Sequence, residues 1–376
     1  MRITIVQGAF FPVPPIMGGA VEKVWFGLGQ ELARRGHTVL HVSRRHPKLL
    51  TSEKIAGVRH LRVSGFQQPR SLVLLKLKDL LFSLAARRRL PAADILVTNS
   101  FWLPMLVRSA RPGRLCVNVN RFPRGQMRYY SHAARLQAVS GVIRDAIIEQ
   151  TPKVAGITKV LPNPLPADFA VPDSPPARTA MRDEFLFVGR IHPEKGLDLL
   201  LPAFSEYLRT ARRPARLRIV GPAAAELGGA GPDYLAHLHQ LASACGPAVE
   251  WLGPVFDSER LRTLYADAHF LVYPSIAARG EASPLTPVEA MACGCVPIVS
   301  NLRCFADYLT DNTNGLVFGL DGSPAANLAA TLTRASAADL PPLQTAALAT
   351  ARDYSMSRVC DHYEEDFLSL CPSLPQ

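Results

Sequence analysis

The chain has 376 residues, of which 48% are hydrophobic and 19% are charged. This composition excludes a disordered protein, and no uncharged apolar run of about 18 residues is present to predict a membrane-spanning helix. The length favours two domains of about 150 to 200 residues each.

The charge is distributed unevenly. Residues 1–170 contain 26 Lys and Arg against 8 Asp and Glu, a net charge of +18, whereas residues 171–376 contain 16 against 23, a net charge of −7. A basic half predicts an anionic partner: a membrane surface, a phosphorylated acceptor or nucleic acid. We set nucleic acid aside, because no helix-turn-helix, zinc or aromatic RNA-binding motif is present.

The first residues, MRITIVQGAFFPV, read as a strand and a turn and lack the features of a signal peptide. The seven cysteines are scattered and include no pair of C-x-x-C motifs, so we expect buried thiols and neither a zinc site nor a disulfide framework. We therefore expect a cytoplasmic protein, and peripheral contact with the inner face of the plasma membrane stays open.

Short strand-like stretches alternate with helical ones in the first half, which is typical of a parallel sheet built from βαβ units. After the first strand, a helix with an apolar stripe at 3.6-residue spacing is expected, ended by Gly36. The predicted strands of this half are Ile3–Gly8, His37–Ser43, Asp94–Ser100, Leu115–Asn120 and Leu136–Ser140.

The stretch Pro162–Thr179 holds six prolines and no periodicity, so it is the predicted linker. Strands then resume, with helices between them at 197–209 and 258–268. The predicted strands of the second half are Phe185–Gly189, Leu217–Gly221, Val249–Gly253, His269–Ser275 and Val296–Ser300. The economical architecture is two Rossmann-like domains facing each other across a cleft, with ligands outside the carboxyl ends of the strands.

The leucine-rich stretch Ser71–Leu90 has Lys76, Lys78 and Arg87–Arg89 at its edges. It suits either a helix on a membrane surface or a helix packed in the core with solvated ends. We expect the second.

Several loops carry candidate ligand-binding residues. Arg190 follows a predicted strand and Lys195 precedes a helix, where a phosphate would be held by cations and free amides; two solvated surface charges are the alternative. Gly18 and Gly19 separate the first strand from its helix, where a backbone can approach a ligand closely or simply make a tight turn. The G-x-G-x-x-G pattern of a dinucleotide site is absent.

Two glutamates lie in the otherwise apolar stretch GEASPLTPVEAMACGCVPIVSN. Thr286 to Glu289 match a capping box with threonine as the N-cap, and Gly294 is placed to end the short helix. Glu281 has no such explanation. Because a buried carboxylate is costly without a partner, we expect it to hold a polar ligand.

These motifs resemble the retaining nucleotide-sugar glycosyltransferases of family 4, which have the two-domain GT-B fold. Arg190 and Lys195 stand at that family's R-x4-K spacing, and Glu281 and Glu289 at its E-x7-E spacing. Further matches are GGAVEKVWFGLGQELARRGHTV, LPNP, LYADAHFLVYPS, NGLVF and the last helix, SRVCDHYEEDFLSL.

The resemblance implies an acceptor-side domain at 1–165 and a donor-binding domain at 166–354, with a helix at about 355–376 packing back on the first. It implies that Arg190 and Lys195 hold the donor diphosphate, that Glu281 lies by the sugar and the reacting centre, and that Glu289 binds ribose. The donor site would be completed by Gly18, Gly19, Ser283, Leu285 and Thr286. No metal or other cofactor is expected, and UDP- or GDP-sugars are favoured as donors.

The sequence departs from the family at two places. Many members carry a histidine after the strand that LCVNVN matches, and here Asn118 and Asn120 stand there instead. We expect these asparagines to lie on the acceptor side with Arg121, Arg124 and Gln126, although a basic surface loop is an equal alternative. After Glu281, Pro284 removes an amide that would otherwise face the sugar, so the donor sugar of relatives is not transferable.

The expected function is a retaining transfer of a hexose from a nucleotide sugar to an anionic or lipid-linked acceptor, in cell-envelope polysaccharide or glycolipid synthesis. Same-face attack is preferred to a covalent intermediate. The alternatives are a GT-B epimerase or phosphorylase and a non-catalytic relative that binds sugar nucleotides. A nicotinamide-dependent oxidoreductase is disfavoured because its glycine fingerprint is missing.

Overall fold

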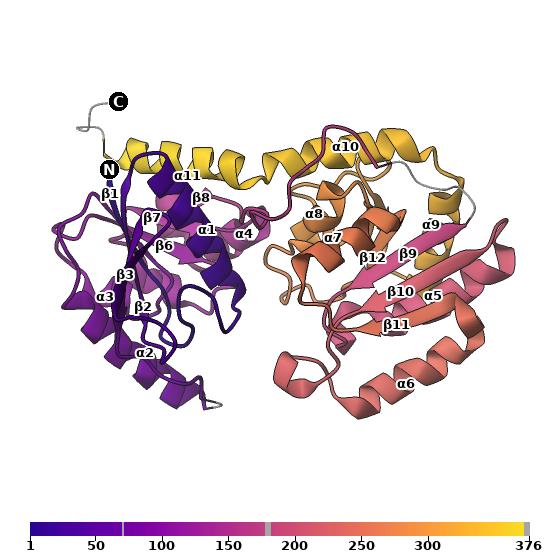
Figure 1. Cartoon of the computed structure of the whole chain (residues 1–376), viewed down its shortest axis with the longest axis horizontal. Helices are drawn as coiled ribbons and strands as arrows, with labels where there is room; N and C mark the ends of the chain where they lie inside the picture. The colour runs from indigo at the N-terminus through magenta and orange to yellow at the C-terminus, as the bar shows by residue number, and fades with distance from the viewer. Residues whose placement is uncertain (70, 177–181, 372–376) are drawn as a thin grey trace. The chain divides into compact units, whose positions relative to one another are not determined.

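The computed structural model describes residues 1–69, 71–176 and 182–371 (Figure 1). The chain forms two α/β units. The first comprises Met1–Ala167 and the segment that begins at Met356, and the second comprises Asp168–Ser355. Residues 177–179 of the expected linker and 372–376 of the expected last helix lie outside the described residues.

The described part of the first unit holds a sheet in the order β3-β4-β2-β1-β5-β6-β7-β8. β3 pairs antiparallel with β4, and the other neighbouring strands pair in parallel. The strands are β1 (Arg2–Val6), β2 (Thr38–Arg44), β3 (Ser52–Ile55), β4 (Val58–Val63), β5 (Ile95–Thr98), β6 (Arg114–Val119), β7 (Arg135–Ala138) and β8 (Thr158–Val160).

One face of this sheet is covered by α1 and α11, which lie side by side (Figure 1). Trp25 of α1 and Tyr363 of α11 are fully buried and meet edge to face, with ring centroids 5.3 Å apart. The α-helices of the first unit are α1 (Ala20–Arg34), α2 (Leu72–Arg87), α3 (Leu103–Leu106), α4 (Gly141–Gln150) and α11 (Met356–Leu370).

The second unit is built on a parallel sheet in the order β11-β10-β9-β12-β13-β14. Such a sheet is covered on both faces, so its strands are mainly apolar, although β9, β10 and β11 also contain charged residues such as Asp183, Arg218 and Glu250. They are β9 (Asp183–Val188), β10 (Ala215–Val220), β11 (Val249–Gly253), β12 (Phe270–Tyr273), β13 (Val296–Ser300) and β14 (Leu316–Phe318).

The core of the second unit lies between this sheet and the helices that carry Leu200, Phe204 and Leu332. The α-helices here are α5 (Leu197–Thr210), α6 (Pro232–Ala242), α7 (Ser258–Asp267), α8 (Thr286–Ala292), α9 (Pro324–Ala337) and α10 (Leu340–Asp353).

Every strand predicted from the sequence is present, within one or two residues at each end. The strands that the prediction missed, β3, β4, β8 and β14, are short or strongly polar, so their apolar pattern is weak. As predicted, α1 ends just before Gly36, which adopts a positive φ of 91° that suits glycine.

The interpretation of 71–90 as a core-packed helix is wrong, because half of its leucines are exposed and none is fully buried. α2 does form there and buries Phe82 and Ala86, but Leu72, Leu77 and Leu81 are exposed. Within the described residues, no helix is both long and apolar enough to cross a bilayer.

Candidate functional site

Two loops meet at the carboxyl ends of β9 and β12, because Gly196 allows their backbones to touch. Gly196 has a φ of 75°, and a Cβ atom there would lie 1.9 Å from the carbonyl oxygen of Pro274. The Glu194 carbonyl accepts hydrogen bonds from the Ile276 amide, at 3.0 Å, and from the Ser275 hydroxyl, at 3.1 Å. The loop before α5 is therefore joined to the loop that leads to Glu281.

The loops bring Lys195, Glu281 and Tyr273 into one buried cluster. The Lys195 ammonium group is paired with Oε1 of Glu281 and donates a hydrogen bond to the Tyr273 hydroxyl at 2.7 Å. The hydroxyl in turn donates to Oε1 of Glu281 at 2.9 Å. The exposed fractions are 9% for Lys195, 5% for Glu281 and 4% for Tyr273. Lys195 is thus not a solvated surface charge.

Burial, with Glu281 as a second cause, raises the pKa of Tyr273 well above its usual range. The phenol therefore remains a neutral hydrogen-bond donor at physiological pH. Removing one member of a buried ion pair is strongly destabilising, because it leaves the other charge uncompensated. The cation, the carboxylate and the hydroxyl of the cluster therefore satisfy one another within the buried site.

Arg190 lies at the end of β9 and has a half-exposed side chain that is held in place. Its Nη2 donates to Glu194 at 2.5 Å and its Nη1 to the Gly228 carbonyl at 2.9 Å. The guanidinium group also acts electrostatically on Tyr273, whose pKa it lowers against the larger effect of burial. The second predicted cation thus belongs to the same region as Lys195.

The predicted capping box at α8 is wrong. The helix begins at Thr286, its N-cap is Leu285, and no side chain caps it. Proline in the first turn of a helix loses no intrahelical hydrogen bond. Pro287 can therefore be the second helical residue, so that the helix begins at Thr286 and not at Pro287. As predicted, Gly294 follows its end with a positive φ of 69°.

Glu289 is half-buried on α8, and its Oε2 accepts a hydrogen bond from the Tyr265 hydroxyl at 3.2 Å. Burial raises the pKa of Tyr265 well above its usual range, and Glu289 adds to this shift. Ser283, Leu285 and Thr286 are half-buried in the segment between the two glutamates. The second unit thereby holds, around one edge of its sheet, all seven of the site residues predicted within it.

In the first unit, Gly18 and Gly19 lie between β1 and α1, with φ angles of 80° and 97°. A Cβ atom on Gly18 would meet nothing within 4 Å, so its backbone is open to approach. A Cβ atom on Gly19 would lie 2.2 Å from Oε2 of Glu22. The missing side chain of Gly19 thus leaves space for the carboxylate of Glu22 in α1. This role differs from the close approach of a ligand that the sequence suggested.

Asn118 and Asn120 are joined to each other and to their neighbours. Oδ1 of Asn118 accepts from Nε1 of Trp25 at 3.3 Å and from Nδ2 of Asn120, which also reaches Oδ1 of Asn99 at 3.2 Å. Asn118 is buried, whereas Asn120 is half-buried. Asn118 therefore holds α1 to the sheet, and Asn120 is the more accessible of the two.

Arg121 and Arg124 are exposed on the loop after β6. Burial raises the pKa of Glu22, and Arg121 acts electrostatically in the opposite direction. Oε1 of Gln126 accepts from the Arg124 amide at 2.6 Å, so this side chain stabilises its own loop.

Three residues of the candidate site were not predicted: Tyr273, Tyr265 and Glu194. Their signal in the sequence is faint. Tyr273 continues a fully apolar strand, and Glu194 is one acid beside several cations. Their hydrogen bonds identify them only in the folded chain.

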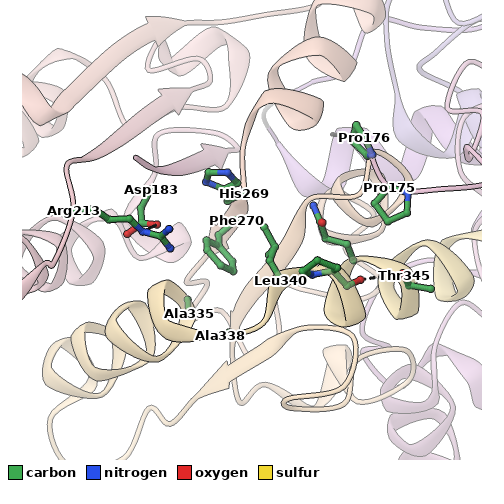
Figure 2. A pocket seen from close by; sticks show the side chains of 12 residues that line it. Pro175, Pro176, Asp183, Arg213, His269, Phe270, Ala335, Ala338, Leu340 and Thr345 are labelled. Carbon is green, nitrogen blue, oxygen red and sulfur yellow. Dashed lines mark hydrogen bonds and ion pairs between the residues drawn. The ribbon is translucent and has the colours of Figure 1, made fainter. Parts of the chain in front are cut away.

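A cavity of about 500 Å³ lies at the opposite edge of the second sheet (Figure 2). It is bounded by Asp183, at the start of β9, by Arg213 and by His269, just before β12. Asp183 and Arg213 form an ion pair at 2.8 Å. Since ligands of such sheets bind outside the carboxyl ends of the strands, this cavity is separate from the candidate site.

Comparisons with known proteins address the fold and the family match of the chain. Residues 175–338 match the family model described as Glycosyl transferases group 1. The sucrose-phosphate synthase of Thermosynechococcus elongatus superposes with a TM-score of 0.76 at 17% identity, covering 100% of both chains. An E. coli structure described as trehalose-6-phosphate bound with UDP-2-fluoro glucose has a TM-score of 0.74 at 14% identity, covering 98% of this chain and 99% of that one.

The chain has the GT-B fold. The group 1 match lies in the unit of this GT-B chain that carries Lys195 and Glu281. A curated relative, the D-inositol 3-phosphate glycosyltransferase 2 of Catenulispora acidiphila, is 37% identical over 140 residues, which are 36% of this chain. The chain covers only 31% of that relative's length.

Proposed function

We propose that the chain is a retaining glycosyltransferase that moves a hexose from a nucleotide sugar to an acceptor hydroxyl. The observation that carries this proposal is the buried contact between Lys195 and Glu281. It lies at the carboxyl ends of the strands in the unit where the group 1 family model matches. A cation and a carboxylate held together there suit a substrate with an anionic leaving group and a sugar that becomes cationic.

In the proposed reaction the bond between the anomeric carbon and the diphosphate oxygen breaks, and both its electrons leave with the nucleoside diphosphate. Arg190 and Lys195 stabilise the charge that develops on that leaving group. The acceptor oxygen attacks the same face, and its proton passes to the departing phosphate. Glu281 positions the sugar and stabilises its positive charge, and Glu289 binds the ribose hydroxyls.

The chemistry that we propose needs no metal ion, because Arg190 and Lys195 would supply the positive charge that stabilises the leaving diphosphate. The donor is proposed to be a UDP- or GDP-sugar. The E. coli neighbour, described as bound with UDP-2-fluoro glucose, supports UDP.

The acceptor is proposed to carry phosphate. The name of the Catenulispora relative includes inositol 3-phosphate and gives no support to the envelope polysaccharide expected from the sequence. The +18 charge of residues 1–170, with Arg121 and Arg124 exposed, suits an anionic acceptor, whether free or lipid-linked.

The test is nucleoside diphosphate release from UDP-, GDP-, ADP- and TDP-sugars without acceptor. Glu281→Gln is the site variant, and Glu259→Gln, on the exposed start of α7, is the matched control. We expect slow release from one donor, lost in Glu281→Gln and kept in Glu259→Gln. If a nucleotide sugar binds but none turns over, the non-catalytic relative that binds sugar nucleotides becomes the better interpretation. If no nucleotide sugar binds, the proposed function fails. Anomeric configuration of the product by NMR distinguishes a retaining transfer from an inverting one.

A further inference from the structure

Helix α2 presents an apolar face to solvent. The exposed fractions of its large apolar side chains are high: Leu72 67%, Val73 77%, Leu74 48%, Leu77 50% and Leu81 48%. Exposed clusters of this kind on a soluble domain mark an interaction surface more often than scattered single residues do.

The helix cannot simply turn this face inward, because its other side is anchored. Oδ2 of Asp79 accepts hydrogen bonds from the backbone amides of Phe101 and Trp102, both at 3.1 Å. Asp79 and Phe82 are buried, and at 100° per residue Val73, Leu77 and Leu81 project from the opposite side. The apolar stripe is therefore a permanent feature of the folded first unit.

Cations surround this stripe. Lys76 and Lys78 flank it, and Arg87, Arg88 and Arg89 at the C-terminal end of the helix are all exposed. From residue 71 to residue 93, Asp79 is the only acid, and it is buried. A surface that pairs exposed leucines with unneutralised arginines complements a bilayer of anionic lipids, which offers phosphate groups above hydrocarbon.

We propose that α2 docks the first unit onto an anionic lipid bilayer, with its leucines at the acyl boundary and its arginines on lipid phosphates. A second copy of the chain suits this face less well. Cations lie in both halves of the helix, so pairing two such helices in either direction would bring like charges together. The lipid contact stands apart from the donor chemistry. Only the purpose of the contact, which is to bring the enzyme to a lipid-linked acceptor, rests on the proposed function.

The experiment is flotation of the full chain with vesicles of phosphatidylcholine, with or without phosphatidylglycerol. The test variant combines Val73→Gln, Leu77→Gln and Leu81→Gln. Leu50→Gln, which removes an equally exposed leucine from the loop before β3, is the matched control. A third variant combines Arg87→Gln, Arg88→Gln and Arg89→Gln.

We expect binding to phosphatidylglycerol vesicles that weakens at high salt, and at least a tenfold loss in both triple variants but not in Leu50→Gln. Equal binding by the apolar triple variant, or no binding by the unmodified chain, overturns the proposal. So does a dimer that the apolar triple variant dissociates. Circular dichroism checks that each variant is folded. Donor release without acceptor, measured on the same samples, shows separately whether the transferase activity is present.

Discussion

The hydroxyl group of Tyr273 donates a hydrogen bond to the same carboxylate oxygen of Glu281 that pairs with Lys195. Tyr273 ends β12, whereas Glu281 lies in the loop beyond it, so the strand fixes the hydroxyl and the hydroxyl fixes the carboxylate. We therefore regard Tyr273 as a positioning residue for Glu281.

Replacing Tyr273→Phe removes that hydroxyl and keeps the ring. We expect donor turnover to fall about tenfold, which corresponds to one lost hydrogen bond to a charged group, while the donor Kd changes little. The control is Tyr207→Phe, a buried tyrosine whose hydroxyl donates to Asp183 at the other edge of the sheet. That variant should lose comparable stability and keep its turnover. Equal turnover in the two variants would contradict a positioning role.

Glu289→Gln should weaken donor binding about tenfold, because a carboxylate accepts two ribose hydroxyls better than an amide does. The thermal unfolding midpoint should change little, since the amide oxygen can still accept from Tyr265. Calorimetric titration with nucleoside diphosphate measures the affinity, and Glu259→Gln is again the control. An unchanged affinity would remove Glu289 from the donor site.

Gly196→Ala should destabilise the second unit by more than about 2 kcal/mol, through positive-φ strain and the clash with the Pro274 carbonyl. Gly322→Ala separates the two causes. Gly322 has a similar φ of 69°, but a Cβ atom there would meet nothing within 4 Å, so we expect a loss of about 1 kcal/mol. Urea unfolding compares the two variants. Equal losses would mean that the close approach to Pro274 is unimportant.

Acidification should destabilise the first unit through His60, which is buried beneath α1 and stacked on His41. Burial lowers the pKa of His60 to about 4, from an ordinary value of 6.5, and it lowers that of His41 as well. Below pH 6.5 the unfolded chain binds more protons at His60, so stability falls as pH falls toward 4. From pH 6.5 to 5 the loss from His60 is about 1.6 kcal/mol.

Urea unfolding at those two pH values tests this linkage. Between the two pH values, His60→Gln should lose less free energy of unfolding than the unmodified chain. His362 lies on the exposed side of α11, so His362→Gln should lose as much as the unmodified chain. The prediction fails if both variants keep the full pH dependence.

Much of the fold could be read from the sequence, because apolar runs bounded by glycine and proline indicate buried parallel strands wherever they occur. The loop that carries Arg190 and Lys195 also follows from this, since it comes directly after a predicted strand. Thr286 was misread because a capping pattern cannot tell the N-cap from the first helical residue when proline follows. Tyr273 was missed because nothing local distinguishes a tyrosine whose hydroxyl binds a buried carboxylate from an ordinary core tyrosine.

The sequence by itself determined the order of strands and helices, the basic first half, and the spacing of the cations and glutamates. Only the tertiary structure decided that Lys195 and Glu281, 86 residues apart, share a hydrogen bond with Tyr273, and that the leucines of α2 face outward. The physical reason is the same in both cases. Periodicity states which residues share a face, but what covers that face depends on elements distant in the chain.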